Sequence, residues 1–408
     1  MNYNENNMLI NNNDNMDLKE WKYSTKLKNG IKCLVDDEKG VNVFKQGSFK
    51  FYGEDDYLDA IDVITNCTKE FYNNSYPIIG IQNNNEGGEI KLGLYLEQFL
   101  QVKLVQNTFF TVKRSDISKN EINKNINKYF DIINPETCIS FKNFDEMKEI
   151  IDYYGNNNKL NRTQFFQLFN STILKKHKIQ RQEIYKLGKL KRPTDIIIFT
   201  DGFSVGATSL FIKGLQETGG AIIVGYKGNP KSDEVFDASQ SPSSFTSFKD
   251  SEIYNNLIEC GFKINEISFY QSFNDTNKNP IPKEYTILPV DERVNIYHKY
   301  NDSYYDEFIN KAKEIFDKYN IQKKCNKNNL LLTFDPNDGK TCYKFSNDKH
   351  AHGGYQCNNN GSWSTNCVPY YCDIGYIFDK KQKNVLKIFV LKIMMMRKEK
   401  NFLFMQLL

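Results

Sequence analysis

The longest hydrophobic runs of the chain are short, and each is followed by a polar, glycine-containing turn. Two of them, 76–81 (YPIIGI) and 195–199 (DIIIF), lead through such turns into stretches with helical spacing at 89–101 and 207–217. A third run, 221–225 (AIIVG), follows the second helical stretch. Apolar runs rich in β-branched residues are typical of strands that are buried on both faces. The pattern therefore predicts two strand–loop–helix units in an α/β fold.

Weaker patterns extend this predicted core over residues 21–320. Alternation of apolar and polar positions indicates strands, and apolar positions three or four residues apart indicate helices. The expected elements are strands at 31–35, 41–44 and 264–273, and helices at 55–72 and 302–319.

Residues 104–192 separate the two strand–loop–helix units and differ from them in composition. This stretch is rich in lysine and asparagine, and amphipathic patterns at 144–154 and 164–174 predict helices there. We therefore expect a helical insertion that forms a lid over a cleft between the two units.

Charge and hydropathy exclude several classes of partner. The 408 residues include 54 basic and 50 acidic side chains, and the lysines alternate with acidic residues and asparagines, so no nucleic-acid-binding surface is expected. Residues 1–20 are polar and asparagine-rich, which predicts disorder. Residues 385–408 are apolar but are interrupted by lysines, so we expect an aberrant or disordered tail and no membrane span.

The nine cysteines are distributed unevenly along the chain. Four are scattered, whereas five crowd into residues 325–372 and predict a disulfide-bonded module at 325–378 in an oxidising compartment. An extracellular or cell-surface location follows, although no signal peptide opens the sequence, and this predicts a truncated amino terminus. Asn-x-Ser/Thr motifs occur at seven positions, a number that chance can produce in a chain this rich in asparagine. No Cys-x-x-Cys pair is present in the module, so no metal site is expected.

Motifs in both units resemble the tail-specific (C-terminal-processing) serine protease family. Gly87-Gly88 after an apolar strand resembles that family's Asp-Leu-Arg-Gly-Asn-x-Gly-Gly segment, although Gly80-Ile81-Gln82 replaces Asp-Leu-Arg. The module also resembles part of a sushi-type domain, through Cys357, an Asn-Gly-x-Trp-Ser sequence and Cys367. The protease resemblance covers about residues 60–300 and implies a curved sheet with helices, in a tail-specific protease or crotonase-like fold. Around the second unit the matching residues are Phe203, Ser204, Ala207, Glu217, Val224, Gly225 and Lys231.

This resemblance implies a mechanism of peptide-bond hydrolysis that uses no cofactor. In the family, a serine attacks the carbonyl carbon, a neutral lysine accepts the serine proton, and backbone N–H groups stabilise the oxyanion. The lysine would have to be partly desolvated to lose its proton near neutral pH. The resemblance places the lysine at Lys231, a helical carboxylate at Glu217, and the oxyanion donors at Ala207 and at Gly87 or Gly88.

The position of the nucleophile is Gly206, which has no hydroxyl group, and three functions therefore stay open. A hydrolase could use another hydroxyl, from Ser204, Thr208 or Ser209. A catalytically inactive relative could bind peptides in the same cleft. A structural or adhesion protein could keep the protease-like core as a scaffold, in which case Lys231 is an ordinary surface lysine. The first two readings have a polypeptide as substrate or ligand, and the sequence does not indicate an oligomeric state.

Overall fold

The structure, a computed structural model, describes most of the predicted core and part of the remaining chain. The described residues are 21–27, 30–50, 54–100, 108–125, 131–134, 139–154, 158–169, 191–240, 244–247, 259, 266–273, 282–283, 286–296, 304–326, 351–372, 376–379 and 384–387. The expected disorder at 1–20 and most of the expected tail lie outside them.

The largest sheet in the described residues has seven strands in the order β1-β2-β3-β4-β11-β12-β15. Neighbouring strands from β3 to β15 run parallel, whereas β1 and β2 are antiparallel to their neighbours. The three hydrophobic runs form β4, β11 and β12, as the sequence predicts. The strands are β1 (Tyr23–Ser24), β2 (Ile31–Asp36), β3 (Val41–Gln46), β4 (Ile78–Gln82), β11 (Ile196–Thr200), β12 (Ile222–Gly225) and β15 (Glu292–Arg293).

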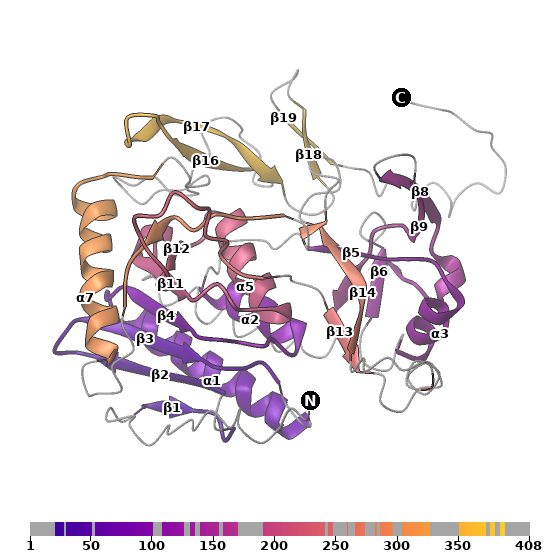
Figure 1. Cartoon of the computed structure of the whole chain (residues 1–408), viewed down its shortest axis with the longest axis horizontal. Coiled ribbons are helices and arrows are strands. Elements are labelled where there is room, and N and C mark those ends of the chain that lie inside the picture. The colour runs from indigo at the N-terminus through magenta and orange to yellow at the C-terminus, as the bar shows by residue number, and fades with distance from the viewer. Residues whose placement is uncertain are drawn as a thin grey trace, which may run out of the picture.

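Helices lie on both faces of this sheet (Figure 1), and a hydrophobic cluster lies between each helical layer and the strands. Alternate strand residues point to opposite faces. Ile196 and Ile198 of β11 therefore pack with helices on one face, and Ile197 and Phe199 pack in a different cluster on the other. The first face holds α1 (Glu54–Asn73), α2 (Ile90–Leu100) and α5 (Gly206–Glu217), and the second holds α7 (Tyr304–Phe316). The result is a mixed α/β fold with a mainly parallel central sheet.

The insertion is richer in strands than the sequence analysis predicts. Its β5 pairs with β14, which pairs with β13, so that it shares a sheet with a later part of the chain. Apart from α3, its elements are mostly strands that form small antiparallel pairs and sheets. The elements of the insertion are β5 (Phe109–Val112), α3 (Asp116–Asn125), β6 (Asp131–Asn134), β7 (Ile139–Ser140), β8 (Glu149–Tyr154), β9 (Asn158–Thr163) and β10 (Gln167–Phe169). The later strands that join its sheet are β13 (Ser244–Ser247) and β14 (Glu266–Phe273).

The helix predicted at 144–154 is wrong, and the helix predicted at 164–174 is wrong over its described residues, 164–169. Residues 144–154 contain a 3₁₀ turn, Phe144–Glu146, followed by β8, and 167–169 form β10, while 170–174 lie outside the described residues. The segment of β8 reads EIIDYY, and its isoleucines and tyrosines favour a strand once an antiparallel partner is available. That partner, β9, follows after three residues, and a local helical spacing cannot reveal it.

Two disulfide bonds with both partners described hold distant segments together. Cys325–Cys357 confirms the disulfide expected in the cysteine-rich module, and Cys367 is also disulfide-bonded. Cys33–Cys67 joins β2 to α1, and both belong to the four cysteines that are scattered along the sequence. The spacing of 34 residues gave no sign that a helix would bring them together.

The cysteine-rich module is packed against the core. Its hairpin consists of β16 (Ala351–Cys357) and β17 (Trp363–Cys372), and its side chains Tyr355 and Trp363 share a hydrophobic cluster with α7 and the central sheet. Two further strands, β18 (Tyr376–Asp379) and β19 (Asn384–Lys387), pair with each other. The strand β19 covers the first residues of the expected tail, whose remainder lies outside the described residues, and a sushi-type fold is not confirmed.

Candidate functional site

Loops at the carboxyl ends of three neighbouring parallel strands meet at one edge of the sheet. These loops follow β4, β11 and β12, and ligands of open α/β sheets commonly bind at such an edge. The N–H of Val205 in the β11 loop donates to the carbonyl of Asn85 in the β4 loop, at 3.0 Å. The two strand–loop–helix units singled out in the sequence are therefore in direct contact.

Gly87 lies directly against the start of α5. A Cβ atom at Gly87 would be 2.6 Å from the carbonyl oxygen of Val205 and 3.0 Å from the nitrogen of Ala207. Its φ of +77° also belongs to the region that favours glycine. The close approach of these two backbones therefore requires a residue without a side chain, and it brings together the two segments predicted to supply oxyanion donors.

The predicted oxyanion donors differ in whether their N–H groups are free. The N–H of Gly87 donates to the side-chain oxygen of Asn85 at 2.9 Å, so it is already used. The N–H groups of Gly88 and Ala207 have no acceptor among the described residues. Gly88 is exposed, whereas Ala207 is fully buried in the first turn of α5. Only Gly88 is thus open to a ligand in this arrangement.

No hydroxyl group of the described residues around Gly206 reaches the surface. Gly206 itself is buried and has a φ of +56°. Ser204 and Thr208 are fully buried, and their hydroxyls have no hydrogen-bond partner in the part of the chain that the structure describes. The hydroxyl of Ser209 is 2.7 Å from that of Ser239, which is also fully buried. None of the three candidate nucleophiles is in a position to meet a substrate without a change in these loops.

The two charged residues that the resemblance singled out lie apart. Lys231 is exposed in the loop after β12, and its amine forms no ion pair with any described residue. Glu217 ends α5, eleven residues from Gly206, roughly 16 Å at about 1.5 Å per residue. Its carboxylate pairs with Lys283 at 2.8 Å. A desolvated lysine and a nearby carboxylate are therefore not assembled around Gly206.

The charged pair at this edge is Asp201 and Lys227, which the sequence analysis did not single out. The fully buried carboxylate of Asp201 accepts from the N–H of Asn84 at 2.7 Å and from that of Phe203 at 3.0 Å. The amine of Lys227 lies 3.3 Å from the same carboxylate and 5.3 Å from the centre of the Phe203 ring. Asp201 thereby links all three loops. In the sequence, an aspartate directly after the apolar run IIIFT was the signal that could have indicated this residue.

A second group of charges lies at the opposite end of α5. Glu97 of α2 is buried against Gly214 of α5, where an added Cβ would be 2.5 Å from its carboxylate. Burial raises the pKa of Glu97 to about 8, with a further contribution from Glu217 and an opposing one from Lys283. Burial also lowers the pKa of Lys213, although Asp237 opposes this shift. The carboxyl of Glu97 is thus buried where α2 packs on α5.

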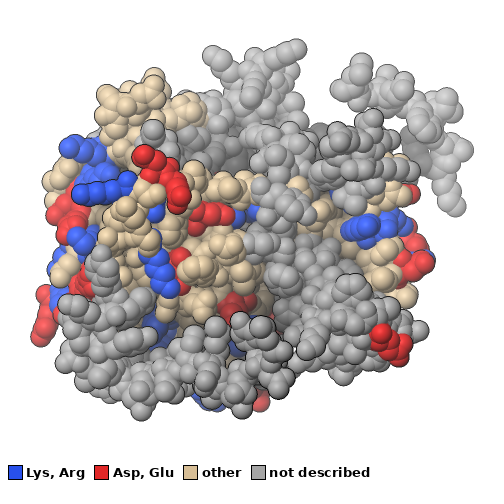
Figure 2. All heavy atoms as spheres, viewed as in Figure 1, with Lys and Arg blue, Asp and Glu red and all other residues tan. Residues whose placement is uncertain are grey.

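Other chemistries find less support in the described residues. No group of three or more histidine, cysteine, aspartate or glutamate side chains there could hold a metal ion. On the face seen in Figure 2, basic and acidic side chains are interspersed wherever the residues are described. No described helix is long and apolar enough to cross a membrane.

Comparisons with known proteins give distant similarities only. No protein-family model and no curated protein matches the sequence. Mature CPAF complexed with lactacystin is 12% identical with a TM-score of 0.34, and the match covers 73% of this chain and 56% of that one. A lipoprotein from Streptococcus agalactiae is 10% identical, with a TM-score of 0.32 and 70% of each chain covered.

A third structure, the photosystem II D1 C-terminal processing protease, is 6% identical with a TM-score of 0.28, and 62% of this chain and 42% of that one are covered. The matches therefore span less than two thirds of both CPAF and the processing protease. At these values, the similarities do not assign the chain to a family.

Replacing Asp201 by asparagine should separate the three loops. In Asp201→Asn the amide nitrogen cannot accept the N–H of Asn84, and the charge opposite Lys227 is lost. We expect the free energy of unfolding to fall by about 2–4 kcal/mol, because buried groups lose their partners. Lys231→Met serves as the control, and should lower it by at most about 0.5 kcal/mol because Lys231 is exposed and forms no ion pair with any described residue. Equal losses in urea-induced unfolding of the two variants would contradict this role for Asp201.

The raised pKa of Glu97 should make stability depend on pH. Between pH 4.5 and 8 its carboxyl stays protonated when folded but ionises when unfolded. The folded state then binds more protons, so this group's contribution to the free energy of unfolding falls by about 1.4 kcal/mol per pH unit as pH rises. Glu97→Gln cannot ionise and should flatten the pH dependence measured by urea-induced unfolding. Parallel curves for the wild type and the variant would exclude this titration.

Proposed function

We propose that this chain binds polypeptide at the edge formed by the three loops and does not hydrolyse it. The observation that carries the proposal is the environment of Gly206. The residue has no side chain, it is buried, and the hydroxyls of Ser204, Thr208 and Ser209 are buried as well. The protease-like arrangement of the two units thus lacks the group that would attack a carbonyl carbon.

Amide hydrolysis needs a nucleophile, a group that accepts its proton, and donors for the oxyanion. A lysine accepts a proton near neutral pH only when desolvation or a neighbouring cation lowers its pKa. Lys231 is exposed, so it lacks that desolvation. Lys227 forms an ion pair with the carboxylate of Asp201 and is itself partly exposed. Neither lysine is therefore the desolvated amine that hydrolysis requires.

Peptide binding requires fewer groups than hydrolysis, and exposed residues at the same edge could provide them. An extended peptide presents carbonyl oxygens, and Gly88 is an exposed residue whose N–H has no acceptor among the described residues. On the adjoining β11 loop, Phe203 is 57% exposed, although most large apolar side chains of the core are buried. An exposed aromatic ring and an unused backbone donor on two adjoining loops suit a peptide segment with an apolar side chain.

Hydrolysis through Ser204 is the second candidate. Its hydroxyl is fully buried and has no partner, which is an unusual state for a polar group. If the β4 loop moved away from the start of α5, this hydroxyl could become accessible. The proposal of binding without hydrolysis and this alternative make opposite predictions for the unmodified protein.

We expect neither the wild type nor Gly206→Ser to release product from a mixture of unstructured peptides, because Lys231 is exposed and Gly206 is buried. The serine should also lower stability by about 1–2 kcal/mol because of the positive φ. Mass spectrometry of the digests is the readout, with Gly206→Ala as the matched control for strain without a hydroxyl. Wild-type hydrolysis that Ser204→Ala abolishes would make Ser204 the nucleophile.

Peptide binding can be tested separately, by selecting random displayed peptides on the immobilised wild-type protein. Enriched peptides should bind in calorimetry, and Phe203→Ala should weaken them about tenfold, as loss of an aromatic anchor commonly does. Ile151→Ala provides a control, because Ile151 is also exposed but lies on β8 of the insertion. Equal affinity for wild type and Phe203→Ala, or no enrichment at all, would contradict binding at this edge.

A further inference from the structure

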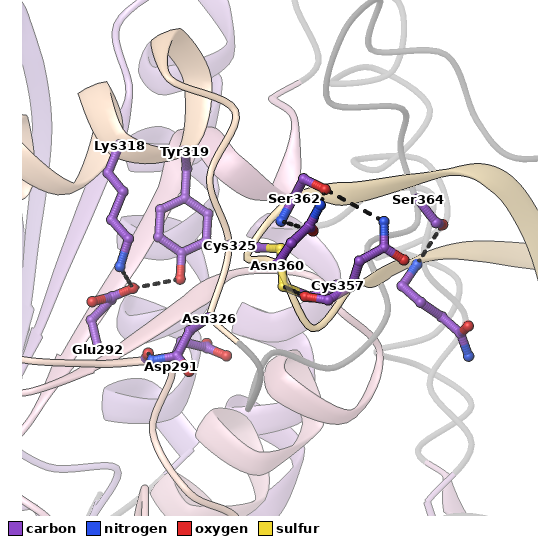
Figure 3. The surroundings of a disulfide bond; sticks show 12 residues. Asp291, Glu292, Lys318, Tyr319, Cys325, Asn326, Cys357, Asn360, Ser362 and Ser364 are labelled. Carbon is purple, nitrogen blue, oxygen red and sulfur yellow. Dashed lines mark hydrogen bonds and ion pairs between the residues drawn. A yellow bond between two sulfur atoms is a disulfide. The ribbon is translucent and has the colours of Figure 1, made fainter.

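The turn that joins β16 to β17 carries an Asn-x-Ser sequence in an exposed position. Asn360 is exposed at this turn, and the N–H of Gly361 donates to the carbonyl of Asn358 at 2.9 Å to close it. Gly361 has a φ of +75°, so the residue between asparagine and serine is one that adopts this turn readily. The nearby disulfide Cys325–Cys357 fixes the base of the turn (Figure 3).

The asparagine and the serine of this sequence contact each other. The side-chain oxygen of Asn360 accepts from the hydroxyl of Ser362 at 2.6 Å and from its backbone N–H at 3.1 Å (Figure 3). Both contacts use the amide oxygen, so the amide nitrogen of Asn360 has no partner among the described residues. The hydroxyl is therefore held beside the amide, while the nitrogen is left free at the surface.

Two of the other Asn-x-Ser/Thr sequences in the described residues are arranged differently. At Asn66, within α1, the hydroxyl of Thr68 donates to the carbonyl of Ile64. The sequence at Asn161 has its asparagine oxygen buried, and its threonine hydroxyl accepts a backbone N–H of β5. At both sites the hydroxyl contacts a backbone group, whereas at Asn360 it contacts the asparagine side chain.

We propose that Asn360 is a site of asparagine-linked glycosylation. In this step the amide nitrogen forms a bond to the anomeric carbon of a lipid-linked oligosaccharide diphosphate. The bond from that carbon to the diphosphate oxygen breaks, and one amide proton leaves with the diphosphate. Glycans of this kind occur on Asn-x-Ser/Thr sequences in surface loops of secreted proteins. The disulfides of this chain form in the same oxidising compartments.

The position of Asn360 suits a bulky modification. The turn is attached to the rest of the chain at Gly361, whose carbonyl accepts from the N–H of Cys325 at 2.9 Å, and exposed turns of this kind tolerate modification. Asn358, Asn359 and Asn360 are all exposed, so a glycan there displaces no packed side chain. The apolar side of the hairpin, with Tyr355 and Trp363, is buried against the core and stays covered.

The test uses the full chain, directed into the secretory pathway of cultured eukaryotic cells by an added leader sequence. Peptide N-glycosidase in ¹⁸O-labelled water converts each glycosylated asparagine into labelled aspartate, which peptide mass spectrometry locates. We expect the label at Asn360. The Asn360→Gln protein should migrate faster in a gel, by the apparent mass of one glycan. Ser362→Ala should cause the same shift, whereas Ser362→Thr should cause none.

Asn358→Gln is the matched control, because it changes an exposed amide in the same turn without removing the sequence motif. It should leave the label at Asn360 unchanged. An unlabelled Asn360 in secreted, disulfide-bonded protein overturns the proposal, whether or not other asparagines carry glycans. A label that persists in Ser362→Ala would also overturn it, because the contact with the hydroxyl would then have no role.

Discussion

The arrangement of the sheet edge depends on the buried carboxylate of Asp201. A buried charge is stable only when it is paired and hydrogen-bonded, and this one obtains its partners from three loops. The N–H of Asn84 fixes the β4 loop, that of Phe203 fixes the β11 turn, and Lys227 connects the β12 loop. With the β4 loop held in this way, Gly87 is placed against the start of α5. Because the close contact leaves no room for a Cβ atom, glycine is required there.

The sequence predicted the central α/β core well, for a physical reason. Strands buried on both faces must be almost continuously apolar, so 76–81, 195–199 and 221–225 could be recognised without knowledge of their partners. Parallel neighbours bring their carboxyl ends to one edge, so the glycines after the first run and the start of α5 had to be near each other. The contact between Gly87 and Val205 follows from this topology.

Features that depend on distant partners could not be predicted in the same way. The strand β8 exists because β9 pairs with it, and a helical spacing of its apolar residues gave the wrong prediction. Cys33 and Cys67 meet because α1 packs on β2. The exposure of Lys231 depends on the path of the loop after β12, which spacing along the chain does not determine. Tertiary packing determines which side chains are buried and which form ion pairs, and residue type alone does not.

The two ends of the seven-stranded sheet have a consequence for self-association. The outermost strands, β1 and β15, are each two residues long. Beside β15, the side chains of Lys318 and Tyr319 contact Glu292, and Asn326 donates to the carbonyl of Asp291. A second molecule that approached either end would find only a short row of backbone groups to pair with. The sheet is thereby protected against edge-to-edge growth into fibrils, although its centre is built from aggregation-prone isoleucine-rich segments.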